Sequence, residues 1–184
     1  MSTQPHPPRG IDGSFVDHCH PFLPIVNVAL DDAFTTIRQS PPLISAMLAI
    51  AARFYIRYTA RTSAMARSLP TRIPLPLSMD PSTPSKLANL AESHLGHTLL
   101  RKQFALSDVQ TILLIAAWGL HSGGRGPDAW IVTGHAARVS RRLGVHKVLA
   151  QAAETARTTE PGSEEWEKLE TFMPQWRTWL CWFA

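Results

Sequence analysis

Cysteine is almost absent from this chain of 184 residues. Cys19 and Cys181 are its two cysteines, too few for a disulfide framework and far short of a multi-cysteine zinc site. A reducing compartment is therefore expected. Long apolar runs are lacking too. The stretches Leu43–Ala52 and Val109–Leu120 fall short of the ~20 residues that span a bilayer, and the polar start Met1–Asp12 has no signal-peptide core. We expect a soluble, intracellular protein with no membrane contact.

Three further patterns are missing. Strict apolar–polar alternation is absent, which predicts an all-α fold. No run of five or more basic residues occurs, and among the scattered cations only Arg138, Arg141 and Arg142 cluster. A net charge of +4 and a pI near 9.5 would suit an acidic partner. The chain has no nucleophile elbow, no His-Glu-x-x-His run and no paired catalytic carboxylates, so we predict that it is not an enzyme.

Apolar residues make up 45% of the chain, many of them at helical spacing. They predict a multi-helix bundle of antiparallel and crossing helices. We expect residues 1–14 to be a flexible Pro-rich tail and residues 15–184 to form one helical domain. Its last segment is aromatic and lacks a C-cap, which predicts truncation at the C-terminus. The expected helices lie between Pro24 and Pro41, over Pro41–Tyr55, from Ser82 or Thr83 to Leu100, from Ser107 toward Gly123, over Pro127–Leu143, and after Pro174.

Several local signals indicate where these helices begin and end and which of their faces are buried. Ser107 and Gln110 fit a capping box, and Val109–Leu120 is apolar on most sides, which places it at the centre of the bundle. Gly123–Gly126 is predicted to end that helix, while the helical signal weakens over Ala150–Glu160 and Arg67–Pro84 reads as a long connection. One buried stripe is predicted for the helix before Ser107, made of Leu87, Leu90, Ala91, Leu95, Leu99 and Leu100.

The stretch Asp128–Leu149, DAWIVTGHAARVSRRLGVHKVL, resembles the fungal-specific transcription factor domain, the middle homology region of binuclear zinc cluster transcription factors. Similar stretches occur in the same order at Phe15–Val26, Pro41–Phe54, Leu106–Gly123 and Arg177–Ala184. The matching signature residues are Trp130, Gly134, Ala136, Arg138, Leu143, Gly144, Val145 and His146, with Val145 in place of the usual leucine.

The resemblance implies a nuclear role in transcription regulation, with transcription machinery or regulatory proteins as partners and a small-molecule effector as a further option. In that family the DNA contact and the zinc ions belong to a six-cysteine cluster. This chain has two distant cysteines, so neither DNA binding nor a zinc cofactor carries over to its residues. The alternatives are a helical adaptor, a small-molecule sensor and, less favoured, an enzyme with an unrecognised site.

Two residues, Arg138 and Arg142, form the candidate contact site, and two further residues of the signature are weighed beside them. Arg138 and Arg142 lie one turn apart and could hold an anion or an acidic segment, although a solvated face or an internal ion pair is favoured; Arg138 is the better candidate for a buried pair. Gly134 in mid-helix favours close helix packing over ligand approach. His146, after a C-cap glycine, is expected to be structural. A metal site at His18, Cys19 and His20 is disfavoured, because the side chains of consecutive residues converge poorly on one ion.

Overall fold

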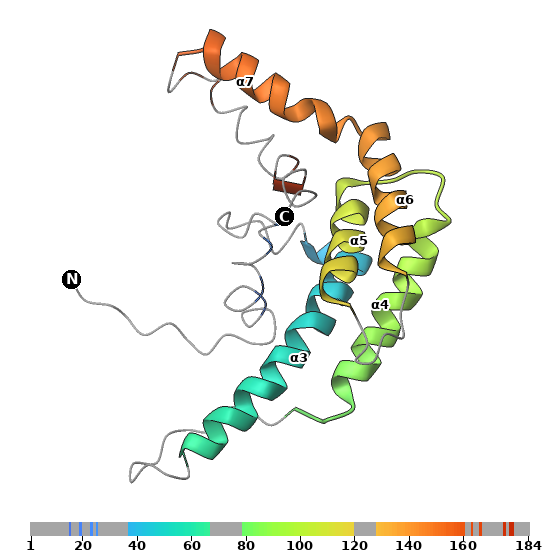
Figure 1. Cartoon of the computed structure of the whole chain (residues 1–184), viewed down its shortest axis with the longest axis vertical. Coiled ribbons are helices and arrows are strands. Elements are labelled where there is room, and N and C mark those ends of the chain that lie inside the picture. Colours follow the sequence, from blue (N-terminus) through green and yellow to red (C-terminus); the bar gives the residue numbers. More distant parts are fainter. Residues whose placement is uncertain are drawn as a thin grey trace, which may run out of the picture.

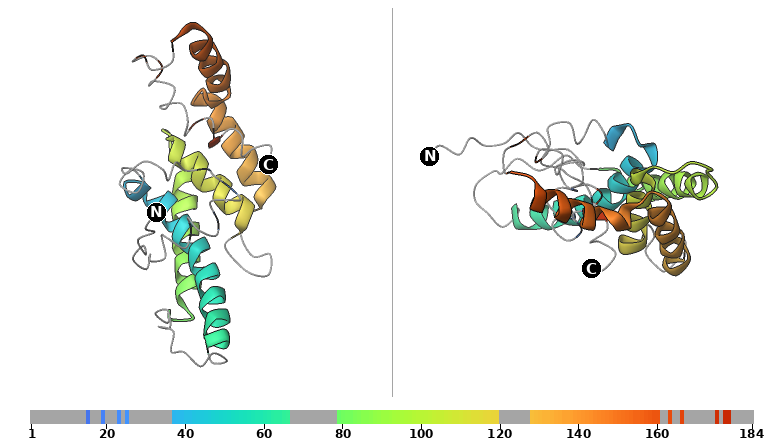
Figure 2. Two further views of the ribbon diagram at one scale, coloured as in Figure 1. Left: turned by 90° about the vertical axis from the view of Figure 1, so that its left-hand side faces the viewer. Right: turned by 90° about the horizontal axis from the view of Figure 1, so that it is seen from above.

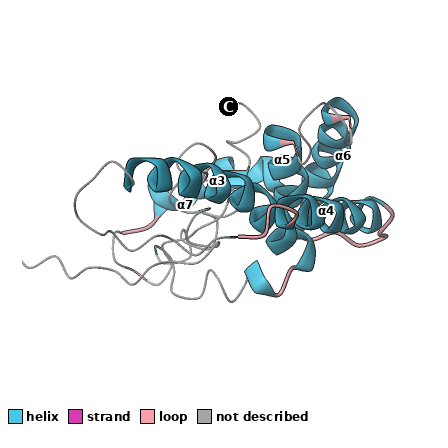
Figure 3. Cartoon of the chain, turned by 90° about the horizontal axis from the view of Figure 1, so that it is seen from below, coloured by secondary structure: helices cyan, strands magenta, loops and turns pink. Residues whose placement is uncertain are grey.

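The computed structural model describes residues 37–66 (the side chains of 57–66 excepted), 79–119 and 128–160, and the single residues 15, 19, 23, 25, 163, 166, 175, 177 and 178. These parts are helical and contain no strand (Figure 3), which confirms the all-α prediction. Outside the described residues lie the predicted tail at 1–14, most of the helix predicted before Pro41, residues 67–78 of the predicted connection, the Gly123–Gly126 turn and most of the segment after Pro174. The elements are α3 (Pro41–Ala66), α4 (Thr83–Leu99), α5 (Leu106–Trp118), α6 (Ala129–Arg142), the 3-10 helix η1 (Val145–Lys147) and α7 (Val148–Thr158).

The helices form a layered pack in which α5 lies at the centre. α3 packs against α4 and α5, and α6 packs against the other side of α5 (Figure 1). α7 joins α6 through η1 and projects at one end of the molecule, away from the α3–α4 pair (Figures 1 and 2). No described helix is both long and apolar enough to cross a membrane.

Burial explains why α5 is central. All eight residues from Asp108 to Ile115 are buried, more than one helical face can account for, so the helix contacts neighbours around most of its circumference. α3 begins with Pro41, where a missing N–H costs nothing. Its Ala46, Ala49 and Ala51 are at most 1% exposed, and these small side chains let neighbouring helices approach closely.

The stripe predicted for α4 was partly wrong. Ala91 and Leu95 are buried, but Leu90 is 48% and Leu100 is 86% exposed. The buried stripe of α4 consists instead of Ala88, Ala91, Leu95 and Thr98, spaced i, i+3, i+7 and i+10. The stripe predicted from the leucines is rotated about the helix axis relative to the observed stripe, because small side chains and Thr98 occupy most of the buried positions.

The predicted ends of α5 also need correction. α5 begins at Leu106, and its first-turn carboxylate is Asp108, whose Oδ2 accepts the N–H of Ala105 at 2.8 Å. Ser107 and Gln110 therefore form no capping box. The helix ends at Trp118, before the predicted glycine turn, because Gly119 adopts a φ of 57° that side chains rarely adopt.

Two other helix boundaries are informative. Ser82 precedes α4 as predicted, but its hydroxyl donates to Asp80 rather than capping the helix. The Ser82 N–H, which donates to the same carboxylate, and then this hydroxyl lower the pKa of the Asp80 carboxyl. The weak signal over Ala150–Glu160 was misleading, since α7 occupies Val148–Thr158. Val148 is its one buried residue, so α7 offers little apolar periodicity to read.

Candidate functional site

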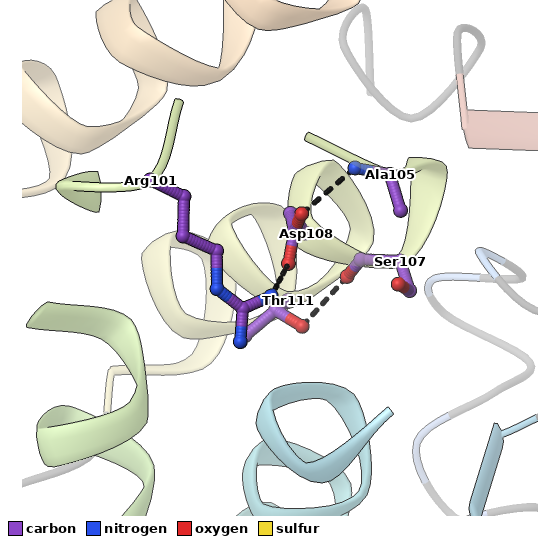
Figure 4. Close-up of polar contacts among 5 residues, drawn as sticks. All are labelled: Arg101, Ala105, Ser107, Asp108 and Thr111. Carbon is purple, nitrogen blue, oxygen red and sulfur yellow. Dashed lines mark hydrogen bonds and ion pairs between the residues drawn. The ribbon is translucent and has the colours of Figure 1, made fainter. Parts of the chain in front are cut away.

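The connection between α4 and α5 is fixed to the first turn of α5 by Asp108. The carboxylate is 2% exposed, accepts the Ala105 N–H at 2.8 Å and lies 3.4 Å from Nη1 of Arg101, which is half-exposed. Figure 4 shows both contacts, and beside them Thr111 Oγ1 donating to the Ser107 carbonyl at 2.7 Å. A buried carboxylate at a helix N-terminus is favoured by the helix dipole and by the free N–H groups there. These contacts therefore anchor the connection to the first turn of α5.

Phe104, in this connection, contacts two side chains of α6. Its ring meets the His135 ring edge-on, with centroids 5.5 Å apart. The Arg142 guanidinium lies over the same ring, 5.8 Å from its centroid, which is cation–π distance. His135, Arg138 and Arg142 are spaced i, i+3 and i+7 on one face of α6. Phe104 therefore brings the α4–α5 connection, with its Lys102, beside that face.

We call Lys102, Phe104, His135, Arg138 and Arg142 the basic face. It is built from two stretches, residues 93–107 and 129–153, that contain no aspartate or glutamate. Together these stretches carry six cations, more than the whole chain's net charge of +4, so the remainder of the chain is net negative. Lys102, Arg138 and Arg142 are exposed. Because the two stretches carry no acid, and Asp108, which follows the first of them, is already paired with Arg101, the described part of this face presents a positive potential to solvent.

The signature residues lie in different environments. Ala136 is fully buried and packs in the core, whereas Trp130 is 85% exposed and Leu143 is 37% exposed. Gly144 adopts a left-handed φ of 74° immediately after α6, which confirms the predicted stop. Arg138 is exposed, and Gly134 and His146 are partly buried. The structure does not bring these residues into one pocket, and only Arg138 belongs to the basic face.

Two expectations about α6 were wrong. Arg138 is not a buried pair, since it is exposed and forms no ion pair with a described residue. Gly134 is not required by close helix packing in the described part of the chain, because a Cβ there would come no nearer than 4.0 Å to a neighbour, Arg138 Nη1. Arg142 is engaged with Phe104 rather than simply solvated.

Gly134 within α6 and Gly144 after it should therefore respond oppositely to substitution by alanine. Gly134→Ala should raise the free energy of unfolding by up to ~1 kcal/mol, because it removes backbone entropy from a helix interior without a clash. Gly144→Ala should lower it by ~1 kcal/mol or more, because alanine is strained at a φ of 74°. Urea unfolding of the two variants measures both changes. A Gly134→Ala variant less stable than wild type would show that close packing does operate there.

Asp108 should matter more for stability than its ion-pair partner. Asp108→Ala leaves the Ala105 N–H and the α5 N-terminus without their carboxylate and should cost ~1–2 kcal/mol. Arg101→Ala removes only a half-exposed partner and should cost less than ~1 kcal/mol. Thermal melts of the two variants rank them. Equal losses would mean that the ion pair, rather than the cap, is what holds the α4–α5 connection.

The described residues give no support to a metal site at residues 18–20. Cys19 is fully buried, and burial raises the pKa of its thiol to about 11, so the thiolate that metals bind is scarce at neutral pH. His18 and His20 lie outside the described residues. No group of three His, Cys, Asp or Glu able to hold a metal ion occurs among the residues that the structure describes.

Sequence reasoning missed several residues of this region. Phe104 and His135 were not singled out, and the signal that could have found them was the pair of acid-free stretches in which they lie. Gln110 was read as a capping residue, but it is buried and its Nε2 donates to the Ile25 carbonyl at 2.8 Å and to Thr178 Oγ1 at 3.2 Å. It therefore ties residues near both ends of the chain to α5.

Comparison with known proteins places the chain in a family. The fungal specific transcription factor domain matches residues 13–184, so the chain belongs to that family, as the Asp128–Leu149 stretch predicted. The match also covers the connections that the motifs left out. No curated protein and no solved structure matches the chain. The family is one of transcription factor domains and not of enzymes.

Proposed function

We propose that this chain is a regulatory helical domain of a fungal transcription factor, that it acts in the nucleus, and that it does not itself contact DNA. Family membership over residues 13–184 is the observation that carries this proposal. In such a factor, DNA and zinc binding would require a cluster of cysteines at short spacing, and this chain's two cysteines lie at positions 19 and 181.

The domain would act by holding an acidic, partly apolar segment of a regulatory protein or of the transcription machinery on the basic face. The acid-free stretches support an acidic partner by charge complementarity. Exposed apolar side chains lie close to the face in sequence: Leu100 is two residues before Lys102, and Ile131 is one turn before His135, with exposures of 86% and 67%. This mixture favours a peptide with acidic and apolar residues over a nucleic acid, whose backbone offers phosphates but no apolar side chains.

A tethered reporter assay tests the proposal. The full chain, fused to a foreign DNA-binding module, should change transcription of a reporter with matching sites. The double variant Arg138→Glu, Arg142→Glu should return it to the level of the module alone. Lys86→Glu, Arg157→Glu is the matched control, because both side chains are 74% exposed and lie on α4 and α7, outside the basic face; it should behave as wild type.

An unchanged reporter with a folded chain would contradict the regulatory role. Equal loss in both double variants would contradict the assignment of that role to the basic face, because it would reflect the loss of positive charge anywhere on the surface.

A further inference from the structure

A small cavity lies between α3 and α5, on elements that the basic face does not use. Its volume is about 210 Å³, and its described lining is Ile50, Arg53, Phe54 and Trp118. Phe54 and Trp118 meet edge to face, with centroids 5.3 Å apart and rings perpendicular. The volume exceeds the ~150 Å³ of an apolar cavity that holds benzene. The cavity therefore has room for one aromatic ring among side chains that suit one.

Arg53 adds a charge to this apolar lining. Its Nη1 donates to the carbonyls of Gly119 and Trp118, at 2.7 and 3.3 Å. These carbonyls lie at the C-terminus of α5, where the helix dipole favours a cation. Both contacts use the same nitrogen. Nε and Nη2 have no partner among the residues that the structure describes.

The Nε–Nη2 edge of the guanidinium has the geometry that binds a carboxylate in bidentate fashion. The N–H groups of Nε and Nη2 point in parallel and can donate to both oxygens of one carboxylate. Because Nη1 is anchored to the end of α5, the guanidinium is already oriented and loses little freedom on binding. A neutral ligand would leave this edge unpaired, and a cationic ligand would be repelled by it.

We propose that the cavity is a binding site for a small aromatic monocarboxylate, with the ring against Phe54, Trp118 and Ile50 and the carboxylate on Arg53. Such a ligand bridges α3 to the end of α5, at the point where the chain leaves α5 on its way to α6. The site gives the domain a small-molecule input that is separate from the partner surface. It does not depend on the proposed partner of the basic face.

Titration calorimetry on the full chain, with benzoate as the probe, tests the site. Benzoate should bind at least tenfold more tightly than benzyl alcohol, which has the ring without the charge, and benzylamine should not bind. Arg53→Met should remove the preference for benzoate over benzyl alcohol, and Arg157→Met, the matched control on α7, should leave it unchanged. Equal affinities of benzoate and benzyl alcohol for wild type, or an unchanged preference in Arg53→Met, would overturn the proposal.

A second variant covers the case in which Arg53→Met, having lost its contact to the end of α5, fails to fold. Ile50→Phe fills the cavity and retains Arg53, so it should weaken both benzoate and benzyl alcohol at least tenfold. Wild-type affinities in folded Ile50→Phe would place any binding elsewhere and overturn the site. The variant Arg138→Glu, Arg142→Glu should bind benzoate as wild type does, so the outcome here is independent of the outcome at the basic face.

Discussion

Leu114→Asp is expected to unfold the domain. Leu114 is 0% exposed in the middle of α5, the helix that contacts α3, α4 and α6. The substitution removes a core side chain, a loss of ~2–5 kcal/mol, and buries a carboxylate with no partner, which costs several kcal/mol more. The sum is comparable to the ~5–15 kcal/mol total stability of a typical domain.

Far-UV circular dichroism through a thermal melt measures the effect. The expected result for Leu114→Asp is little helical signal at room temperature and no cooperative transition. Leu100→Asp is the matched control, because Leu100 is 86% exposed and a surface substitution changes stability by ~0.5 kcal/mol or less. A cooperative melt of Leu114→Asp near the wild-type midpoint would refute the central position of α5.

Charge reversal on the basic face should abolish most binding of an acidic peptide. A fluorescent peptide with alternating acidic and aromatic or leucine residues should bind the wild-type chain at low salt. Arg138→Glu, Arg142→Glu should weaken it by ~10–100-fold, because two attractive contacts become repulsive. Lys86→Glu, Arg157→Glu should weaken it less than ~3-fold, because these exposed cations lie outside the face and salt screens them over ~10 Å.

Fluorescence anisotropy at two ionic strengths gives the affinities. Wild-type binding should fall as salt rises yet persist in part, since the apolar contacts around Leu100 and Ile131 are not screened. A duplex DNA that binds more tightly than the peptide and competes with it would identify the face as a nucleic-acid surface instead. Equal loss in the two double variants would show that the binding is not localised.

The extent of α6 could be predicted almost to the residue because its signals are local. Asp128 precedes the helix and accepts the Trp130 N–H at 2.8 Å, and Gly144 stops it with a positive φ. α5 lacks comparable signals at its start: Ala105 has no capping side chain, and the carboxylate that serves the first turn acts from three residues inside the helix. The rotation of α4 was misjudged because its buried stripe holds two alanines and a threonine beside a single leucine.

The candidate site was less accessible from the sequence. The cations of α6 were recognised as a cluster, but their link to Phe104 depends on how α6 packs beside the α4–α5 connection. Arg53 and Trp118 are 65 positions apart, and nothing local in either segment predicts their contact or the cavity beside it. Long-range packing decides such contacts, whereas local pattern decides where helices begin and end.

One measurement tests most directly whether the basic face is where the domain meets its partner. Amide chemical shifts of the full, isotope-labelled chain are recorded while the acidic peptide is added. This assignment of the partner surface predicts saturable shifts concentrated at residues 100–104 and 131–142, with α3 and α7 nearly unchanged. Shifts confined to other helices, or no shifts at peptide concentrations where anisotropy reports binding, would contradict it.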